Sequence, residues 1–147
     1  MDNSSSLSIL IVEDNQDHAE LLSEIMNVVT VKHSLSYAEN GLKALEKLNN
    51  RSSSKLSNTK LPEVIFLDIK MPEMDGITTL KEIRSKPIFD PIRIVMVTTS
   101  TIDTEIENCM QLGANGYLAK PVDSETLEKM FIELGCAWAV AAKRTNL

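Results

Sequence analysis

The amino-acid sequence predicts an α/β fold, a doubly wound sheet of five parallel strands flanked by five helices. Short apolar segments and longer amphipathic segments follow one another along the chain, in strand–helix order, five times. The apolar segments lack the polar alternation of a sheet with one solvated face, which indicates strands buried on both faces. A repeating strand–helix order of this kind is typical of a parallel sheet covered by helices.

The first half of the chain holds three of the expected strands and two of the expected helices. The strands, which are short apolar runs, are expected at 7–12, at 32–37 (an edge-like strand) and at 64–67. The helices, which place apolar residues on one face, are expected at 20–29 and 41–48. The polar, serine-rich stretch at about 49–61 is expected to form an extended surface loop.

The third helix is expected at 77–83, because Pro87 and Pro91 prevent its continuation. Two further apolar strands are expected on either side of the next helix, at 92–97 and 116–118. With these two strands the expected sheet is complete.

Residues typical of helix ends predict the last two helices. Ser100 and Asp103 resemble a capping box that opens the fourth helix, and Gly113 is a typical residue after a last helical turn. Asp123 is expected to begin the fifth helix, and Gly135 to weaken it. The residues of this helix that are expected to face inward are Leu127, Phe131, Leu134 and Trp138.

Composition limits the possible partners. The 147 residues, 43% of them hydrophobic, fit one domain with a sizeable core. The formal net charge of -6 argues against nucleic acid or an anionic membrane as a partner, because both attract basic surfaces. Cys109 and Cys136 lie among apolar neighbours without the spacing of a disulfide framework or metal site, so buried free thiols are expected.

The start of the chain does not read as a targeting segment. Residues 1–6 are expected to be a disordered lead-in to the domain. The first 15 residues contain only a short apolar run with acidic neighbours, unlike a secretory leader. No apolar stretch is long enough to span a bilayer, so a cytoplasmic protein is expected.

Polar residues suited to catalysis or metal binding follow four of the expected strands. Glu13 and Asp14 follow the first strand, Asp68 the third, Thr98 the fourth and Lys120 the fifth. In a parallel sheet these strand ends meet at one edge, where ligands bind. Three carboxylates there repel one another unless a cation neutralises them. Oxygen ligands favour a hard ion, and Mg²⁺ is the natural one because it also binds phosphate oxygens.

A metal, a lysine, a hydroxyl and a nucleophilic carboxylate are the parts that phosphoryl transfer requires. Each residue alone has a plainer explanation: Glu13 or Asp14 as a helix cap, Lys120 as a surface lysine, Thr98 as a strand hydroxyl. The agreement of the strand ends favours a site over these separate explanations.

Four motifs carry a resemblance to a known family. They are IVEDN at 11–15, FLDIKMPEMDG at 66–76, VTTS at 97–100 and YLAKP at 117–121. With them, residues 7 to about 140 resemble the single receiver domains of bacterial two-component response regulators, CheY-like proteins. The lengthened loop, VTTS and Trp138 resemble the receivers paired with bacterial phytochromes. The resemblance implies a flavodoxin-like strand order 2-1-3-4-5 and a receiver domain at 7–147 without an output domain.

The resemblance also implies roles for the strand-end residues. Asp68 would be the phospho-acceptor, and Lys120 would pair with its carboxylate and later with the phosphoryl group. Asp14, Asp68 and the backbone carbonyl of Lys70 would bind Mg²⁺, with Glu13 near the metal through water. Thr98 would move toward the phosphoryl group.

Further implications concern signalling. Tyr117 would swing inward as Thr98 moves and so alter a partner-binding face. The phosphodonor would be a sensor histidine kinase or a histidine phosphotransfer protein, and the reader an unknown target protein or a second copy bound through the fourth and fifth helices. Such a protein is a phospho-accepting switch rather than an enzyme, with slow self-dephosphorylation. The Lys120–Pro121 bond would be cis.

Two alternatives and two departures stand beside this interpretation. A phosphatase that forms a phosphoaspartate often carries a second aspartate two residues after the nucleophile, where this chain has Lys70. A flavin-binding domain of similar topology would need a phosphate-binding loop after the first strand, where Glu13 and Asp14 would repel phosphate. Lys70 could alter phosphoaspartate hydrolysis, and Thr99, where many receivers carry alanine, could restrict access.

Overall fold

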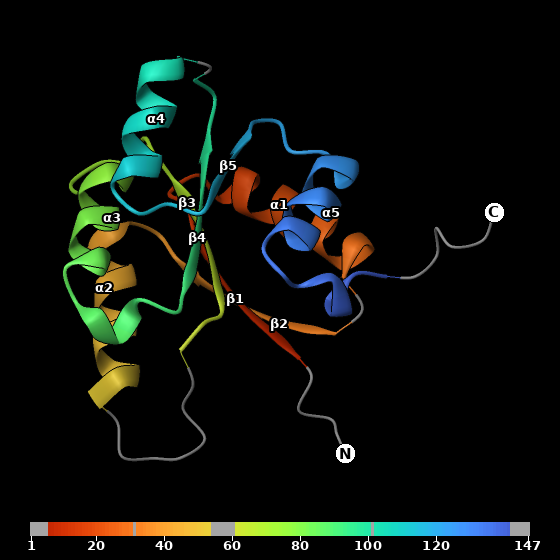
Figure 1. Cartoon of the computed structure of the whole chain (residues 1–147), viewed down its shortest axis with the longest axis horizontal. Coiled ribbons are helices and arrows are strands. Elements are labelled where there is room, and N and C mark those ends of the chain that lie inside the picture. Colours follow the sequence, from red (N-terminus) through yellow and green to blue (C-terminus); the bar gives the residue numbers. More distant parts are fainter. Residues whose placement is uncertain (1–5, 31, 54–60, 101, 142–147) are drawn as a thin grey trace.

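Five parallel strands form one sheet in the order β2-β1-β3-β4-β5, as a computed structural model of residues 6–30, 32–53, 61–100 and 102–141 shows (Figure 1). The strands are β1 Leu7–Val12, β2 His33–Ala38, β3 Val64–Asp68, β4 Arg93–Thr98 and β5 Gly116–Ala119. Both the expected fold class and the expected strand order are confirmed.

Helices cover both faces of the sheet, α1 and α5 on one face and α2, α3 and α4 on the other (Figure 1). They are α1 Gln16–Val29, α2 Gly41–Ser53, α3 Gly76–Arg84, α4 Asp103–Gln111 and α5 Ser124–Glu133, with short 3₁₀ helices at Pro87–Phe89 and Ala137–Ala139. Within the ranges that the model describes, no helix is both long and apolar enough to cross a membrane.

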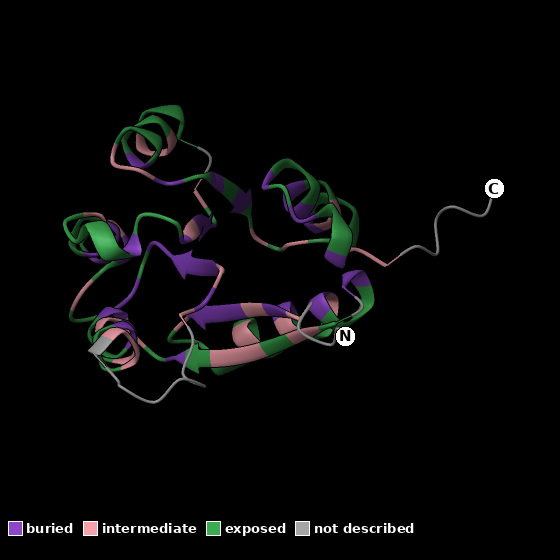
Figure 2. Ribbon diagram, turned by 60° about the horizontal axis from the view of Figure 1, so that its bottom comes forward, coloured by how far each residue is buried: buried purple, intermediate pink, exposed green. Residues whose placement is uncertain are grey.

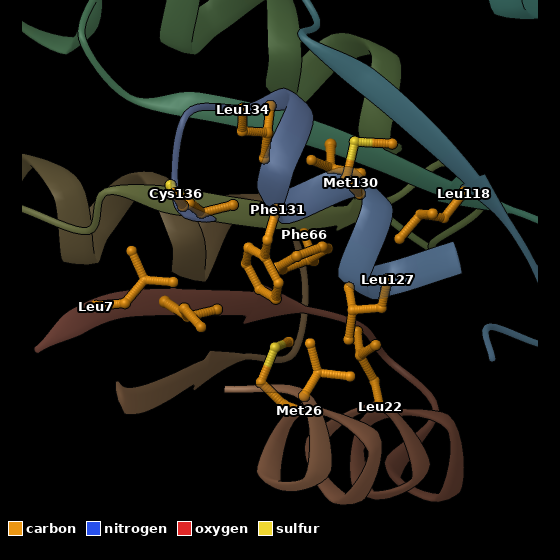
Figure 3. Close-up of a cluster of buried hydrophobic side chains, with 14 of the residues drawn as sticks. Leu7, Leu22, Met26, Phe66, Leu118, Leu127, Met130, Phe131, Leu134 and Cys136 are labelled. Atoms are coloured by element: carbon orange, nitrogen blue, oxygen red, sulfur yellow. The ribbon is translucent and has the colours of Figure 1, made fainter. Parts of the chain in front are cut away.

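Each face of the sheet has its own apolar core, because successive strand residues point to opposite sides. Phe66 of β3 belongs to the core under α1 and α5, whereas its neighbour Leu67 belongs to the other core. Figure 3 shows Phe66 and Phe131 meeting at the centre of the first core, edge to face, with ring centroids 5.8 Å apart. Every residue of β3 is buried, so this strand holds the residue at its carboxyl end in a fixed position (Figure 2).

Helix α1 begins four residues earlier than the apolar pattern predicts. The Asn15 side chain caps it by accepting the His18 backbone N–H at 3.1 Å. The first turn is polar and therefore carries no apolar periodicity, which is why the sequence pattern starts only at Glu20. The early start places His18 on the helix, close to the strand ends.

Helix α2 extends beyond the predicted boundary at Leu48 and ends at Ser53. The first part of the predicted loop at 49–61 is therefore helical, since polar residues can continue a helix whose apolar face is already docked. Asn49 also accepts a hydrogen bond from the Lys86 ammonium at 3.0 Å. The rest of that loop, residues 54–60, and the lead-in residues 1–5 lie outside the described part of the chain.

The capping box predicted for α4 is wrong. Ile102 precedes the helix without a side-chain capping bond, and the Ser100 hydroxyl oxygen accepts the Ile102 N–H at 3.2 Å. Ser100 thus shapes the turn before the helix instead of capping it. Gly113 does follow the helix, in the left-handed conformation with φ of 110°. Cys109 is the one residue of α4 that is buried, so this helix packs against the rest of the domain through few side chains and is thinly attached in this sense (Figure 2).

The prediction for the end of the last helix is partly wrong. Leu127, Phe131 and Leu134 are buried as expected, but Trp138 is 50% exposed. The helix ends before Gly135, whose φ of 86° redirects the chain, so helical spacing no longer applies at Trp138. Cys109 and Cys136 are buried free thiols, as expected.

The guanidinium of Arg84 joins three connections at the end of α3. It donates to the backbone oxygens of Gly113 at 2.9 Å, Phe89 at 3.1 Å and Ile92 at 2.7 Å. It also donates to the Asn115 side chain at 3.0 Å. These acceptors lie after α4, in the 3₁₀ turn and before β4, so one side chain holds the loops at this end of the sheet together.

We expect Arg84→Ala to lower the free energy of unfolding by about 2–4 kcal/mol, because hydrogen bonds from a charged donor are lost and carbonyls are left unpaired. Arg84→Lys should recover only part, since an ammonium lacks the planar fork of donors. Urea denaturation measures both. The exposed Lys81 on the same helix provides the control, and an equal loss in Lys81→Ala would contradict the role of Arg84.

Candidate functional site

The carboxylates predicted from the strand ends come together at one edge of the sheet. One oxygen from each of Glu13, Asp14 and Asp68 lies within 4.8 Å of the others. Thr98 ends β4, buried, and Lys120 follows β5 directly. The convergence expected from a parallel sheet is therefore present.

The segment after β1 positions two of the carboxylates differently. The Glu13 backbone still bonds to the sheet, with its N–H donating to the Ala38 oxygen at 3.0 Å. Its side chain is only 7% exposed, and Oε2 accepts the Asn15 N–H at 3.2 Å. Asp14, in the turn before α1, is exposed. One carboxylate is thus held inside the site, and the other stands at its opening.

Asp68 is the last residue of β3, and its side chain is 7% exposed. Burial and, after it, the neighbouring charge of Glu13 raise the pKa of Asp68 to about 6, while Lys120 opposes the rise. Burial and the Glu13 carboxylate outweigh the single lysine in contact with Asp68. The site therefore favours an added positive charge, either a proton or a metal ion.

The loop after Asp68 folds back tightly onto its own strand. The Gly76 N–H donates to the Ile69 oxygen at 2.8 Å. A Cβ at Gly76 would lie 2.2 Å from the backbone oxygen of Asp68, so only glycine fits this close approach. The Asp75 side chain then caps α3 by accepting the Thr78 N–H at 2.8 Å. Lys70 of this loop lines the same cleft as the three carboxylates.

The Lys120 ammonium lies among three acceptors. Its nitrogen is 2.8 Å from Glu13 Oε1, 3.0 Å from His18 Nδ1 and 3.4 Å from Asp68 Oδ1. The backbone N–H of Lys120 donates to the backbone oxygen of Thr98 at 2.8 Å, which keeps the end of β5 beside β4. The Lys120–Pro121 peptide bond is cis, as the family resemblance implies.

His18 is the residue at this site that sequence reasoning missed. It lies on the first turn of α1, four residues after Asp14. The apolar pattern predicts a helix from Glu20 onward and gives no position for the residues of the earlier turn. The signal that could have predicted His18 is Asn15 as a helix cap, because a helix that begins there has its first turn beside the end of the strand.

The pair predicted to act as a switch occupies two different environments. Thr98 is 1% exposed, and its hydroxyl oxygen accepts the Ser100 N–H at 2.9 Å. Tyr117 is 41% exposed, with its side chain at the surface of the edge strand β5. The hydroxyl is thus turned toward the start of α4, and the tyrosine is in an outward position.

Among the clefts that open at the site, two share four of their lining residues. The acidic cleft, of about 220 Å³, is lined by Glu13, Asp14, Asn15, His18, Asp68, Lys70, Thr99 and Lys120. The apolar cleft, of about 260 Å³, shares Glu13, His18, Thr99 and Lys120 and adds Leu21, Leu22, Ile25, Val97, Pro121 and Val122. Lys70 and Thr99 line the acidic cleft, where they could affect access to Asp68.

Known proteins share this arrangement of sequence and fold. The response regulator Rcp1 of Synechocystis sp. is 31% identical over 130 residues, which cover 88% of this chain and 87% of Rcp1. The osmosensing histidine protein kinase SLN1 of Saccharomyces cerevisiae is 32% identical over 144 residues. This chain spans only 11% of the length of that kinase.

Solved structures agree with the sequence comparison. The Mn(2+)-bound form of Rcp1 matches with a TM-score of 0.71 at 30% identity, over 90% of this chain and 94% of that one. The bacteriophytochrome response regulator AtBRR matches with a TM-score of 0.77 at 30% identity, over 92% and 97%. The family model of the response regulator receiver domain matches residues 9–132. The chain therefore belongs to the response regulator receiver domain family.

Proposed function

We propose that this receiver domain accepts a phosphoryl group on Asp68 and passes the signal on through a change of shape. The observation that carries the proposal is the buried Asp68 carboxylate, held beside two other carboxylates and a lysine at the strand ends. The N–P bond of a phosphohistidine would break, with the electron pair staying on the histidine nitrogen, and an O–P bond to Asp68 would form. Lys120 would stabilise the phosphoryl oxygens.

The carboxylate cluster suits a hard divalent cation, which we propose to be Mg²⁺. Asp14, Asp68 and the Lys70 backbone carbonyl would bind it, with Glu13 acting through water. The raised pKa of Asp68 supports this assignment, because burial and the Glu13 carboxylate together outweigh the one lysine in contact with Asp68. When bound, the ion would neutralise charge on the transferring oxygens. The Mn(2+)-bound form of Rcp1 shows a divalent cation in a relative.

The proposed phosphodonor is a sensor histidine kinase or a histidine phosphotransfer protein. The apolar cleft supports a protein donor, since it adjoins the acidic cleft and presents Leu21, 47% exposed, beside Ile25. A helix carrying the phosphohistidine could bury these side chains while its imidazole enters the acidic cleft. A cytoplasmic location, where such donors act, is part of the proposal.

A chain of hydrogen bonds supports Thr98 as the start of the output. Thr98 Oγ1 accepts the Ser100 N–H, and Ser100 Oγ accepts the Ile102 N–H at the beginning of α4. If the Thr98 hydroxyl turns to donate to a phosphoryl oxygen, the first bond is lost and the thinly attached α4 is free to shift. Tyr117 would then turn inward, and the altered face of α4, β5 and α5 would bind a target or a second copy.

The phosphatase alternative is not favoured. A phosphatase of this type needs a carboxylic acid two residues after the nucleophile, and that residue is Lys70. A lysine cannot replace that carboxylic acid as the acid and base in both the formation and the hydrolysis of the phosphoaspartate. We therefore propose a phospho-accepting switch with slow self-dephosphorylation.

The first prediction concerns the acceptor itself. With Mg²⁺ and acetyl phosphate, intact-mass measurement should show one phosphoryl adduct on the wild type and none on Asp68→Asn. Asp75→Asn is the matched control, because asparagine can still cap α3, and it should keep the adduct. An adduct on Asp68→Asn would contradict the assignment, and rapid turnover of a phosphate ester would favour the phosphatase.

The second prediction concerns the switch. Thr98→Ala should still form the adduct but should lose the change in amide hydrogen exchange that phosphorylation causes in α4 and β5, because no hydroxyl remains to turn. Thr99→Ala, next in sequence and exposed, should keep that change. An equal response in wild type and Thr98→Ala would remove Thr98 from the mechanism.

The third prediction concerns stability and pH. The pKa of Asp68 is about 6 in the folded protein against the ordinary aspartate value of 3.8, so the folded state binds this proton more tightly than the unfolded chain. Ionised Asp68 therefore lowers stability above pH 6, and the loss disappears as the pH falls toward 3.8.

Without divalent ions at pH 7, Asp68→Asn should be more stable than the wild type, by on the order of 2 kcal/mol. Urea denaturation should show this difference shrinking at pH 4.5. Added Mg²⁺ should stabilise the wild type and leave Asp68→Asn nearly unchanged. A difference that is constant across pH would contradict the electrostatic explanation.

A further inference from the structure

The three N–H groups of the Lys120 ammonium face three acceptors on three different elements. Glu13 follows β1, His18 lies on α1 and Asp68 ends β3, with separations of 2.8, 3.0 and 3.4 Å from the ammonium. The Lys120 side chain is 14% exposed, so water has little access to it. An ammonium has three donors and no acceptor, so these three groups can satisfy it fully.

This geometry favours one tautomer of the His18 imidazole. Because the ammonium can only donate, Nδ1 of His18 must offer its lone pair, and the ring proton must be on Nε2. A proton on Nδ1 would set an N–H against the N–H groups of Lys120. The neutral Nε2–H tautomer is therefore the one that fits this structure.

The segment after β1 holds both His18 and Glu13 in place. Glu13 Oε2 accepts the Asn15 N–H, and Asn15 Oδ1 accepts the His18 N–H. The Glu13 carboxylate, the helix cap and the His18 backbone are thus connected within one turn. Two of the three acceptors around Lys120 come from this turn, and neither is the group that would be phosphorylated.

We propose that His18 is a positioning residue for Lys120, whose neutral imidazole, together with Glu13, keeps the ammonium directed at Asp68. This inference rests on the proposed function. A phosphoryl oxygen on Asp68 would replace the Asp68 contact, while the Glu13 and His18 contacts remain. The ammonium is then already in place where negative charge develops, which is the condition for electrostatic stabilisation without reorganisation.

His18 is well suited to substitution, because its side chain is 47% exposed and its backbone makes the capping bond. Beryllium fluoride, a phosphoryl mimic, can be titrated in the presence of Mg²⁺ and followed by amide NMR. His18→Leu should weaken its binding roughly threefold to tenfold, whereas His18→Gln, which keeps a side-chain acceptor, should stay within about twofold of wild type. Mg²⁺ binding measured alone should not change in either variant.

The second histidine provides the control. The sequence contains two, and His33 begins β2, at the opposite end of the sheet from the site. His33→Gln should bind the mimic like the wild type and should identify the two imidazoles in long-range ¹H–¹⁵N spectra. In those spectra His18 should show a bare Nδ1 and a protonated Nε2.

Three results would overturn the proposal: mimic binding in His18→Leu equal to wild type, equal weakening in His18→Leu and His18→Gln, or a protonated Nδ1 on His18. Failure of the proposed function looks different, because the wild type itself would then form no adduct on Asp68 and would not bind the mimic. An adduct on Asp68 together with normal mimic binding by His18→Leu would remove His18 alone.

Discussion

The structure depends on one electrostatic constraint, the burial of Asp68 beside Glu13 with a single lysine in contact with both. Burial and, after it, the Glu13 carboxylate raise the pKa of Asp68, so the site favours additional positive charge. The fold provides the rigidity that makes this possible, because β3 is buried along its whole length and fixes its last residue. The same shortage of positive charge makes a divalent cation and a phosphoryl group mutually favourable there, since each brings the charge that the other needs.

The two faces of the sheet contribute to the site unequally. On the α1 side, Glu13, Asn15 and His18 form a connected turn, and the apolar cleft continues from it. On the other side, α4 buries only Cys109 and begins without a side-chain cap. A firmly built side suits recognition of a donor, and a thinly attached helix suits a response, because little packing must be lost for it to move. Under the proposed function, this asymmetry would give input and output separate physical locations around one carboxylate.

The sequence predicts those parts of the site that depend on strand ends. Asp68 and Lys120 stand at the ends of short apolar runs that predict strands, and a parallel sheet then brings these ends together. His18 was not predictable from the same signal, since it comes from a polar helical turn without apolar periodicity. Ser100 shows the opposite error, because its spacing to Asp103 resembles a capping box although its hydroxyl binds the turn before the helix. Local competition between hydrogen-bond partners decides such cases.

The position of Lys120 explains why the turn after β1 matters more than its exposed residues suggest. The ammonium nitrogen lies 2.8 Å from Glu13 Oε1 and 3.4 Å from Asp68 Oδ1, so it is closer to Glu13. In the unphosphorylated protein its strongest contact is therefore with a residue that does not react. A lysine held mainly by Asp68 would compete directly with an incoming phosphoryl group for that carboxylate. Under the proposed function, anchoring the ammonium on Glu13 and His18 would leave Asp68 available as a nucleophile while the positive charge stays within reach, so binding and reactivity would depend on different contacts of the same side chain.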